Sequence, residues 1–159
     1  MSIRGFKAAL AYGEKLKKFK DADAAERYFL ARKDKLLEKL EKNCAKHGLF
    51  VPDYSVESLK KLEKLYFDLC GTGGFAGAGF AKKEFESAMS MYFGEVVVRN
   101  NRDAKFEARS FPFSKDKYEF YVSKGLLSMA IADKFLDLDK RPDNVRKNSI
   151  FREYNKYFK

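Results

Sequence analysis

The sequence is poor in the residue types that most often carry enzyme chemistry or bind metals. Its 159 residues include two cysteines, one histidine, three prolines and no tryptophan. Because His47 is the only histidine, the chain has too few histidines for a nitrogen-rich metal site and only one candidate for a histidine-based catalytic triad. Cys44 and Cys70 are too few for a disulfide framework and lack CxxC spacing, so we expect two reduced thiols. We therefore expect neither a metal nor another cofactor.

Long apolar runs are also missing. The hydrophobic stretches are only a few residues long, which is too short to cross a bilayer. The first residues, MSIRGFKAALAYGEK, contain neither a continuous apolar segment nor a signal cleavage site. The sequence therefore predicts a cytoplasmic protein with no stable membrane association.

The composition does provide enough apolar material for a packed core. Hydrophobic residues make up 45% of the chain and aromatic residues 16%, and most of the latter are phenylalanine. Charged residues make up 35%, and the mean hydropathy of -0.52 is typical of a well-hydrated surface. A chain of this length fits one domain, so we expect a single domain over residues 1–159.

The positive charge is concentrated at the two ends of the chain. The net charge is +10, and residues 1–20 and 140–159 each contribute +5, so the residues between them are neutral overall. Because chain termini often lie close together, the ends are expected to form one basic patch that faces an acidic partner. The alternative is that these lysines form ordinary hydrated helix surfaces. The predicted partner-binding residues are Lys15, Lys17, Lys18, Arg146, Lys147, Arg152 and Lys156.

The spacing of apolar residues changes from helical to strand-like between Glu84 and Phe113. Apolar residues recur at helical spacing from Phe85 to Val97, which predicts an amphipathic helix at the centre of the fold. Asn100 and Asn101 tolerate the left-handed conformation that closes a helix. From Ala104 onward apolar and charged residues alternate, as expected for a half-buried strand. The chain is therefore expected to run from helix through a tight turn to strand.

The remaining elements are predicted to be mostly helical. Pro112 is expected at a strand end, and Tyr118–Val122 is expected to pair with the first strand as an antiparallel hairpin. The overall expectation is an α+β fold, a mostly helical single domain with a small antiparallel β-hairpin after a central helix. The other helices are predicted at 3–19, from Asp21 or Asp23 to 46, at 55–71, at 124–136, and from Asn148 or Ser149 to the end.

Residues 71–80, GTGGFAGAGF, hold five of the ten glycines and invite comparison with a phosphate-binding loop. A P-loop requires a Lys-Ser or Lys-Thr pair after its last glycine and follows a strand, whereas this segment continues with Ala-Lys-Lys after a predicted helix. The dinucleotide-binding fingerprint also fails, because Ala76 occupies the position of the third glycine. We expect a flexible connector.

Few side chains indicate a local chemical site. Gly94 within the central helix costs about 1 kcal/mol against alanine, which indicates either close packing or a polar binding site at Glu95 and Arg99. Packing over Gly94, with Glu95 paired to Arg99, is the favoured interpretation. The three aspartates near the end of the predicted 124–136 helix follow no calcium-loop spacing, and no recognised catalytic motif is present, so we predict a protein that is not an enzyme.

The last segment, RKNSIFREYNKYFK, interleaves cations with aromatic residues. Exposed rings and cations together can bind single-stranded nucleic acid. The alternative, which we favour, is that the aromatic residues form the buried stripe of an amphipathic helix. In that case only the basic residues are left to bind nucleic acid, and basic residues alone are a nonspecific indication of that function.

Three segments, SVESLKKLEKLYFDL, MYFGEVVVRN followed by KFEARSFPF, and NSIFREYNKYF, resemble a family of small uncharacterised bacterial proteins. In that family a helix ending in Tyr-x-Gly-Glu-Val precedes a strand that opens with a Gly-Lys-Trp-like sequence, whereas this chain has Ala104, Lys105 and Phe106. The resemblance covers about 55–158 and implies no activity for named residues. Proteins of similar appearance include toxin-immunity and other partner-binding proteins.

These observations favour a non-catalytic bacterial protein that binds a macromolecule through a basic surface formed by both termini. The expected partner is an acidic protein, for example a toxin neutralised by an immunity-like protein. Two alternatives stay open. One is a nucleic-acid-binding accessory protein that uses the same cations, and the other is an enzyme with a carboxylate-based pocket that leaves no local signature.

Overall fold

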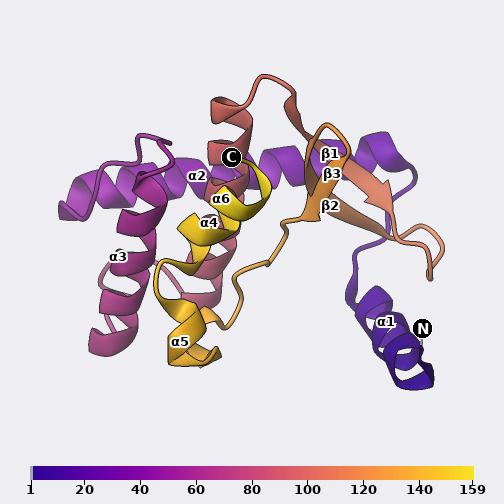
Figure 1. The fold of residues 1–159 in the computed structure, drawn as a ribbon, viewed down its shortest axis with the longest axis horizontal. Coiled ribbons are helices and arrows are strands. Elements are labelled where there is room, and N and C mark those ends of the chain that lie inside the picture. Colours follow the sequence, from indigo (N-terminus) through magenta and orange to yellow (C-terminus); the bar gives the residue numbers. More distant parts are fainter. Residues whose placement is uncertain (1) are drawn as a thin grey trace.

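The computed structural model describes residues 2–159 as a helical body with a small sheet on one side (Figure 1). The strands form one antiparallel sheet in the order β1-β2-β3. The predicted α+β class, mostly helical with a small antiparallel sheet after a central helix, is confirmed. The elements are α1 (Ile3–Lys15), α2 (Ala22–His47), α3 (Ser58–Thr72), α4 (Lys82–Asn100), β1 (Ala104–Ser110), β2 (Tyr118–Lys124), β3 (Leu127–Ala130), a 3₁₀ turn (Leu138–Lys140), α5 (Asp143–Arg146) and α6 (Ser149–Tyr157).

Helix α4 lies at the centre of the fold and is buried on almost all sides from Phe85 to Val97. Helix α2 crosses it, α3 packs beside it, and the sheet covers its C-terminal half (Figure 1). The predicted amphipathic stripe is therefore correct but incomplete, because Ser87 and Ser90 on the supposed polar side are also buried. These hydroxyls reach partners there: Ser90 accepts a hydrogen bond from the backbone N–H of Phe135 at 3.2 Å.

The inner face of the sheet is a stack of phenylalanine rings. Phe106 on β1 and Phe120 on β2 lie parallel with their centroids 5.2 Å apart, and Phe29 of α2 stacks on Phe120 at 5.1 Å. Such offset ring pairs add about 0.5–1.5 kcal/mol beyond the burial of their area. The stack fixes the sheet against the N-terminal half of α2.

The predicted helix over 124–136 is wrong. The chain turns at Gly125, which adopts a left-handed conformation (φ 59°), and returns as β3, with Tyr121 paired to Ala130 and Lys124 to Leu127. Turns follow β3 up to the 3₁₀ turn. The apolar spacing of Leu127, Ala130 and Ile131 fits a helix as well as a strand end, and the turn at the glycine decides between them.

Three helix ends also differ from prediction. Asn101 is extended (φ -140°) rather than left-handed, and α4 is closed instead by the side chains of Asn100 and Asn101, which donate to the carbonyls of Val96 and Val97. Helix α1 stops at Lys15, before the predicted end at residue 19, and α3 begins at residue 58, with the Ser55 hydroxyl accepting from its first N–H.

The glycine-rich segment after α3 is attached to the core through three of its side chains. Phe75, Ala78 and Phe80 are buried, and the rings of Phe75 and Phe80 pack edge-on against Phe85 of α4. Residues 71 and 72 complete α3 rather than belonging to the connection. In α6, likewise, Tyr154 and Phe158 are buried while Tyr157 is partly exposed, as expected for an aromatic stripe that packs inward.

Candidate functional site

The predicted basic residues of the two termini lie on different parts of the molecule. Helix α1, which ends at Lys15 and is followed by Lys17 and Lys18, lies beside the sheet at one end, whereas α5 and α6 lie against the helical body (Figure 1). Each group is exposed or partly exposed. The structure thus brings the members of each group together, but not the two groups.

Both arginines of the C-terminal group hold their own segment together. Arg146 pairs with Asp143 and donates a hydrogen bond of 2.8 Å to the carbonyl of Asp139. Arg152 donates to the carbonyl of Val145 at 2.7 Å. Neither Lys147 nor Lys156, in the part of the chain that the structure describes, forms an ion pair.

Glu95 and Arg99 form the predicted ion pair, joined by a lysine that the sequence did not reveal. The carboxylate accepts from Nε of Arg99 at 2.8 Å and from Nζ of Lys33 at 3.0 Å. Burial opposes ionisation of Glu95, but hydrogen bonds from the two cations outweigh it and lower its pKa. The arginine also lies over the ring of Tyr54. The predicted packing over Gly94 is confirmed, because a Cβ there would meet Ile131 and Phe106 at 2.7 Å.

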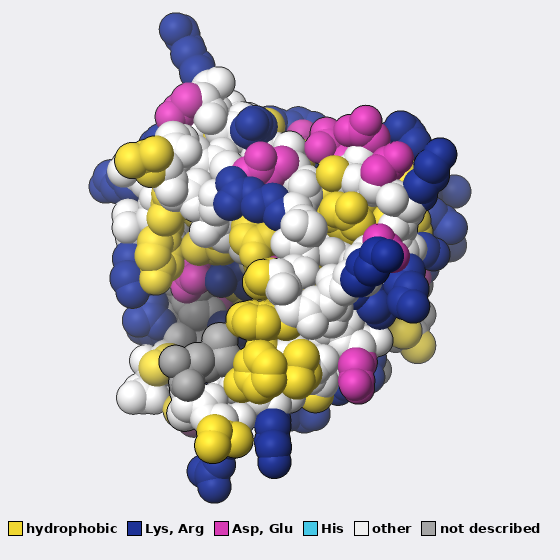
Figure 2. All heavy atoms as spheres, turned by 90° about the vertical axis from the view of Figure 1, so that its right-hand side faces the viewer, with side chains coloured by type: hydrophobic (Ala, Val, Ile, Leu, Met, Phe, Trp, Pro, Cys, Tyr) yellow, Lys and Arg dark blue, Asp and Glu magenta, His cyan; other side chains and the backbone are white. Residues whose placement is uncertain are grey.

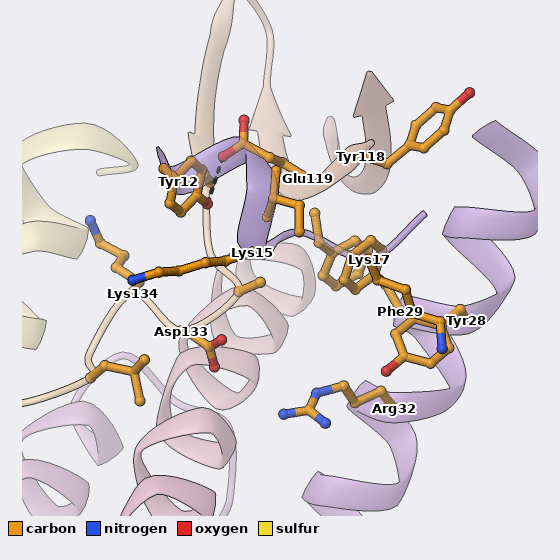
Figure 3. A pocket seen from close by; sticks show the side chains of 15 residues that line it. Tyr12, Lys15, Lys17, Tyr28, Phe29, Arg32, Tyr118, Glu119, Asp133 and Lys134 are labelled. Carbon is orange, nitrogen blue, oxygen red and sulfur yellow. Dashed lines mark hydrogen bonds between the residues drawn. The ribbon is translucent and has the colours of Figure 1, made fainter. Parts of the chain in front are cut away.

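A hollow lies between α1, α2, β2 and the segment after β3, and we call it the α1–α2 cavity (Figure 3). Its volume is about 610 Å³, which is within the range of about 300–1,000 Å³ typical of small-molecule sites. Its lining comprises Tyr12, Lys15, Leu16, Lys17, Tyr28, Phe29, Arg32, Tyr118, Glu119, Phe120, Ala130, Ala132, Asp133, Lys134 and Leu136.

Helix α1 forms one wall of this cavity and is held by contacts to the β1–β2 connection. Gly13 is buried against Phe111, where a Cβ would lie 2.6 Å from the ring. The largely buried Lys117 donates to the carbonyls of Glu14, at 3.1 Å, and Leu16. These donations satisfy carbonyls at the C-terminal end of α1, which have no partner within the helix. The position of Tyr12 and Lys15 in the wall follows from them.

A second hollow adjoins the first along the exposed side of α2, and we call it the α2–α4 groove. Its volume is about 440 Å³, and its lining includes Arg32, which also lines the α1–α2 cavity. The hydroxyl of Ser87 in the groove donates to Asp133 of the cavity at 2.8 Å. The two hollows therefore form one continuous surface.

Cations outnumber carboxylates on this surface. Its carboxylates are Glu84, Glu119 and Asp133, and five of its cations make no ion pair among residues 2–159. Like charges gathered on concave surfaces raise the local concentration of anions. We call these seven cations the basic face: Lys15, Lys17, Arg32, Lys35, Lys39, Lys83 and Lys134.

Hydrophobic side chains are exposed near the basic face as well. On the side of the molecule shown in Figure 2 they gather low on the surface, at the level where α1 lies in Figure 1, with lysine and arginine side chains around them. Ile3, Phe6 and Tyr12 of α1 are among the exposed hydrophobic residues.

The sequence pointed to Lys15 and Lys17 but not to the α2 and α4 members of the basic face. A signal was present, because Arg32, Lys35 and Lys39 follow the i, i+3, i+7 spacing that places residues on one helix face. The neutral charge of the central region concealed it, since the compensating acids of α2 lie on other faces or pair locally. Asp34, for example, pairs with the adjacent Lys33 at 2.8 Å.

Within residues 2–159, the described part of the chain, no three His, Cys, Asp or Glu side chains gather closely enough to hold a metal ion. Asp139, one of the three aspartates considered from sequence, instead accepts hydrogen bonds from Lys82 at 2.7 and 2.8 Å. None of the helices described has the length and apolarity required to cross a membrane.

Comparison with known proteins places these features in a family without an assigned activity. The model of a family described as "Uncharacterised protein YwmA" matches residues 18–158. A protein of Bacillus subtilis (strain 168), named "Uncharacterized protein YwmA", is 26% identical over 113 residues, which is 71% of this chain and 71% of that protein. No solved structure matches the chain. The family match begins after α1, so Tyr12 and Lys15 of the cavity wall lie outside it.

Proposed function

Since this chain belongs to the YwmA family of uncharacterised bacterial proteins, we propose that it is a non-catalytic cytoplasmic protein that binds an acidic protein partner. The resemblance of the sequence to a small uncharacterised bacterial family is confirmed by the family match. An acidic toxin, neutralised in the manner of an immunity protein, is one partner of the required chemistry. Two free cysteines are consistent with a reducing compartment.

The basic face is the observation that carries the proposal. Five of its seven cations make no ion pair with a described residue, and four of these five side chains, including Lys35 and Lys83, are lysines free to reach carboxylates on a partner. Complementary charge steers association and fixes which partner is accepted. The proposed surface keeps Lys15 and Lys17 from the sequence prediction and replaces the C-terminal residues with side chains of α2 and α4.

An acidic protein fits this face better than nucleic acid does. Single-stranded nucleic acid binding combines cations with exposed rings on which bases stack. Tyr28 is an exposed ring beside the cations, but Lys17 lies over it, 4.6 Å from its centroid, and it packs against Phe19 at 5.2 Å. One face of that ring is therefore already occupied by a lysine.

The experiment compares two charge-reversal variants that change the net charge equally. One carries Lys35→Glu and Lys83→Glu in the α2–α4 groove, and the other carries Lys147→Glu and Lys156→Glu on the C-terminal segment. Each variant and the unaltered protein are used to capture partners from native bacterial lysate. Captured proteins are identified, purified and measured for affinity by calorimetry at two salt concentrations.

The expected result is an acidic protein that the unaltered protein and the C-terminal variant retain and that the groove variant loses. Reversal of two interface charges is expected to weaken binding by about 2–5 kcal/mol. Equal retention by the groove variant would refute the proposal. If the unaltered protein retards single-stranded DNA in a gel, and this binding weakens with salt and is lost in the groove variant, the same surface would be assigned to nucleic acid instead.

A further inference from the structure

The α1–α2 cavity combines an apolar region with a cationic one. Figure 3 shows the amino groups of Lys15 and Lys134 on one side of the cavity, with Arg32 on another side and Asp133 between them. A molecule that suits both regions has an apolar body and an anionic group. The apolar region is lined by Leu16, Phe29, Phe120, Ala130 and Ala132.

The carboxylates of the lining already have hydrogen-bond donors. Glu119 accepts a hydrogen bond from the hydroxyl of Tyr12 and another from Tyr121, each at 2.8 Å. Asp133 accepts from the hydroxyl of Ser87 at 2.8 Å. These two acids are therefore held by neutral hydroxyl groups and form no ion pair with Lys15, Lys17 or Arg32 of the lining.

The cations of the lining are accordingly available to a ligand. Neither Lys15 nor Arg32 makes an ion pair or a side-chain hydrogen bond with any of residues 2–159, and Lys134 has a single ion pair, to Glu153 at 2.8 Å. Figure 3 shows Lys15 extended toward the stem of Lys134, whose amino group points away from Lys15. Two ammonium groups on one side of a cavity repel each other, and an anion bound beside them offsets this repulsion.

Charge and size restrict the ligand further. The lining carries four cations and two carboxylates, a surplus of two positive charges, in a cavity of about 610 Å³. A phosphate dianion is usually held by backbone amides at a helix N-terminus or a glycine-rich loop, and none of the elements of the lining begins a helix there. A monoanion loses less hydration energy on entering a site that is partly apolar.

We infer that the α1–α2 cavity binds a small organic carboxylate with an apolar body. Its carboxylate lies beside Lys15 and Lys134, and its body lies against Phe29 and Phe120. The site shares Lys15 and Lys134 with the basic face, but Lys35 and Lys83, which are reversed to test partner binding, line only the α2–α4 groove, so the two proposals can fail separately. Helix α1 completes the site by supplying Tyr12 and Lys15.

The test uses the full chain and two pairs of probes, naphthoate with its neutral amide and octanoate with its neutral amide. Binding is measured by calorimetry and by changes in the amide NMR spectrum. Lys15→Met removes one proposed carboxylate contact without breaking an ion pair, and Lys134→Met removes the other. Lys140→Met is the matched control, because Lys140 is exposed and lies outside the cavity.

At least one carboxylate is expected to bind about tenfold more tightly than its amide and to shift the amide signals of Ala130 and Ala132. Lys15→Met and Lys134→Met are each expected to weaken that carboxylate about tenfold, with Lys140→Met unchanged. Absence of binding by both carboxylates at about 1 mM overturns the inference. Equal affinity of carboxylate and amide, or equal affinity of the Lys15 variant and the unaltered protein, also overturns it.

Discussion

The hydroxyl of Tyr12 on α1 donates a hydrogen bond of 2.8 Å to Oε1 of Glu119 on β2, across 107 positions of sequence. Burial and the neighbouring carboxylate both raise the pKa of this tyrosine, so it stays protonated as the donor. The bond joins an element outside the family match to one inside it. It thereby links two elements that line the α1–α2 cavity.

Loss of this hydroxyl is expected to loosen α1 without unfolding the protein. Tyr12→Phe keeps the ring against Phe111, whose centroid is 5.5 Å away, and removes only the hydrogen bond. Hydrogen exchange of the α1 amides should then increase by an amount equivalent to about 0.5–1.5 kcal/mol. Tyr28→Phe is the control, because its hydroxyl makes no hydrogen bond to residues 2–159. Unchanged exchange in α1 would show that the bond does not hold the helix.

Alanine substitutions at two helical glycines are expected to have opposite effects on stability. At Gly94 the new methyl group would lie 2.7 Å from Ile131 and Phe106, and overpacking of this kind costs about 1–3 kcal/mol. At Gly71, near the end of α3, nothing lies within 4 Å, so Gly71→Ala should stabilise by up to about 1 kcal/mol. Urea denaturation of both variants provides the measurement. A Gly94→Ala protein as stable as the unaltered one would contradict close packing at this position.

The central helix could be predicted because its pattern is local. Phe85 to Val97 repeat at helical spacing, and the glycine within that repeat predicted close packing by some other element. The packing partner could not be named, since Ile131 reaches Gly94 only after the β2–β3 turn that the sequence interpretation missed. The error over 124–136 arose from four apolar residues whose spacing suits both a helix and a strand end.

The cavity could not be predicted because its lining comes from four separated parts of the chain. Lys15 and Lys17 were identified from the charge of the N-terminus, whereas Arg32 joins them only in the folded chain, where α2 lines the same cavity. The C-terminal cations were grouped with Lys15 and Lys17 on the general tendency of termini to meet, and α6 instead packs on α3. The net charge of a segment depends only on its composition, whereas the basic face depends on which segments the tertiary structure brings together.

Glu95 is expected to stabilise the fold more strongly at neutral pH than at acidic pH. The pKa of its carboxyl is lowered in the folded state, so its stabilisation is present above the ordinary value of 4.5 and is lost as the pH falls through the lower folded value. Glu95→Gln should cost about 1–3 kcal/mol at neutral pH, because Lys33 loses its buried partner, and less as the pH falls below 4.5.

The control for this prediction is Glu57→Gln. Glu57 pairs with Lys60 on the surface, where its side chain is 68% exposed, and such pairs contribute about 0–1 kcal/mol. Denaturation at a series of pH values separates the two variants. A cost of Glu95→Gln that does not change with pH would mean that the carboxylate charge is not what Lys33 and Arg99 require.

Glu86, two turns earlier on α4, is expected to show the opposite pH dependence. Its side chain is buried, and one carboxyl oxygen, Oε1, has no hydrogen-bond partner within residues 2–159. The other oxygen accepts from the backbone N–H of Asp137. Burial raises the pKa of Glu86, and the carboxylates of Asp137 and Asp139 add to this effect, while the Asp137 N–H and Lys82 act against it.

A raised pKa in the folded state means that folding favours the protonated form of Glu86. The stability that Glu86 contributes is therefore fully present at pH values below 4.5, its ordinary pKa. This stability declines as the pH rises through the higher pKa of the folded state. Glu86→Gln cannot ionise, so it should match the unaltered protein near pH 4.5 and become more stable than it toward neutral pH. The gain should approach about 1.4 kcal/mol for each unit by which the pKa is raised.

Urea denaturation of Glu86→Gln beside Glu38→Gln, whose side chain is exposed on α2, provides the measurement for this prediction. The difference between Glu86→Gln and the unaltered protein should widen with pH, while that for Glu38→Gln should stay constant. A Glu86→Gln difference that narrows with pH would mean that the carboxylate is stabilised as an anion, with Lys82 outweighing burial. Because Glu86 and Glu95 lie on one helix, the opposite pH dependences expected for them can only come from their different surroundings. Oε1 of the buried Glu86 has no hydrogen-bond partner among residues 2–159, whereas the carboxylate of Glu95 lies between two cations.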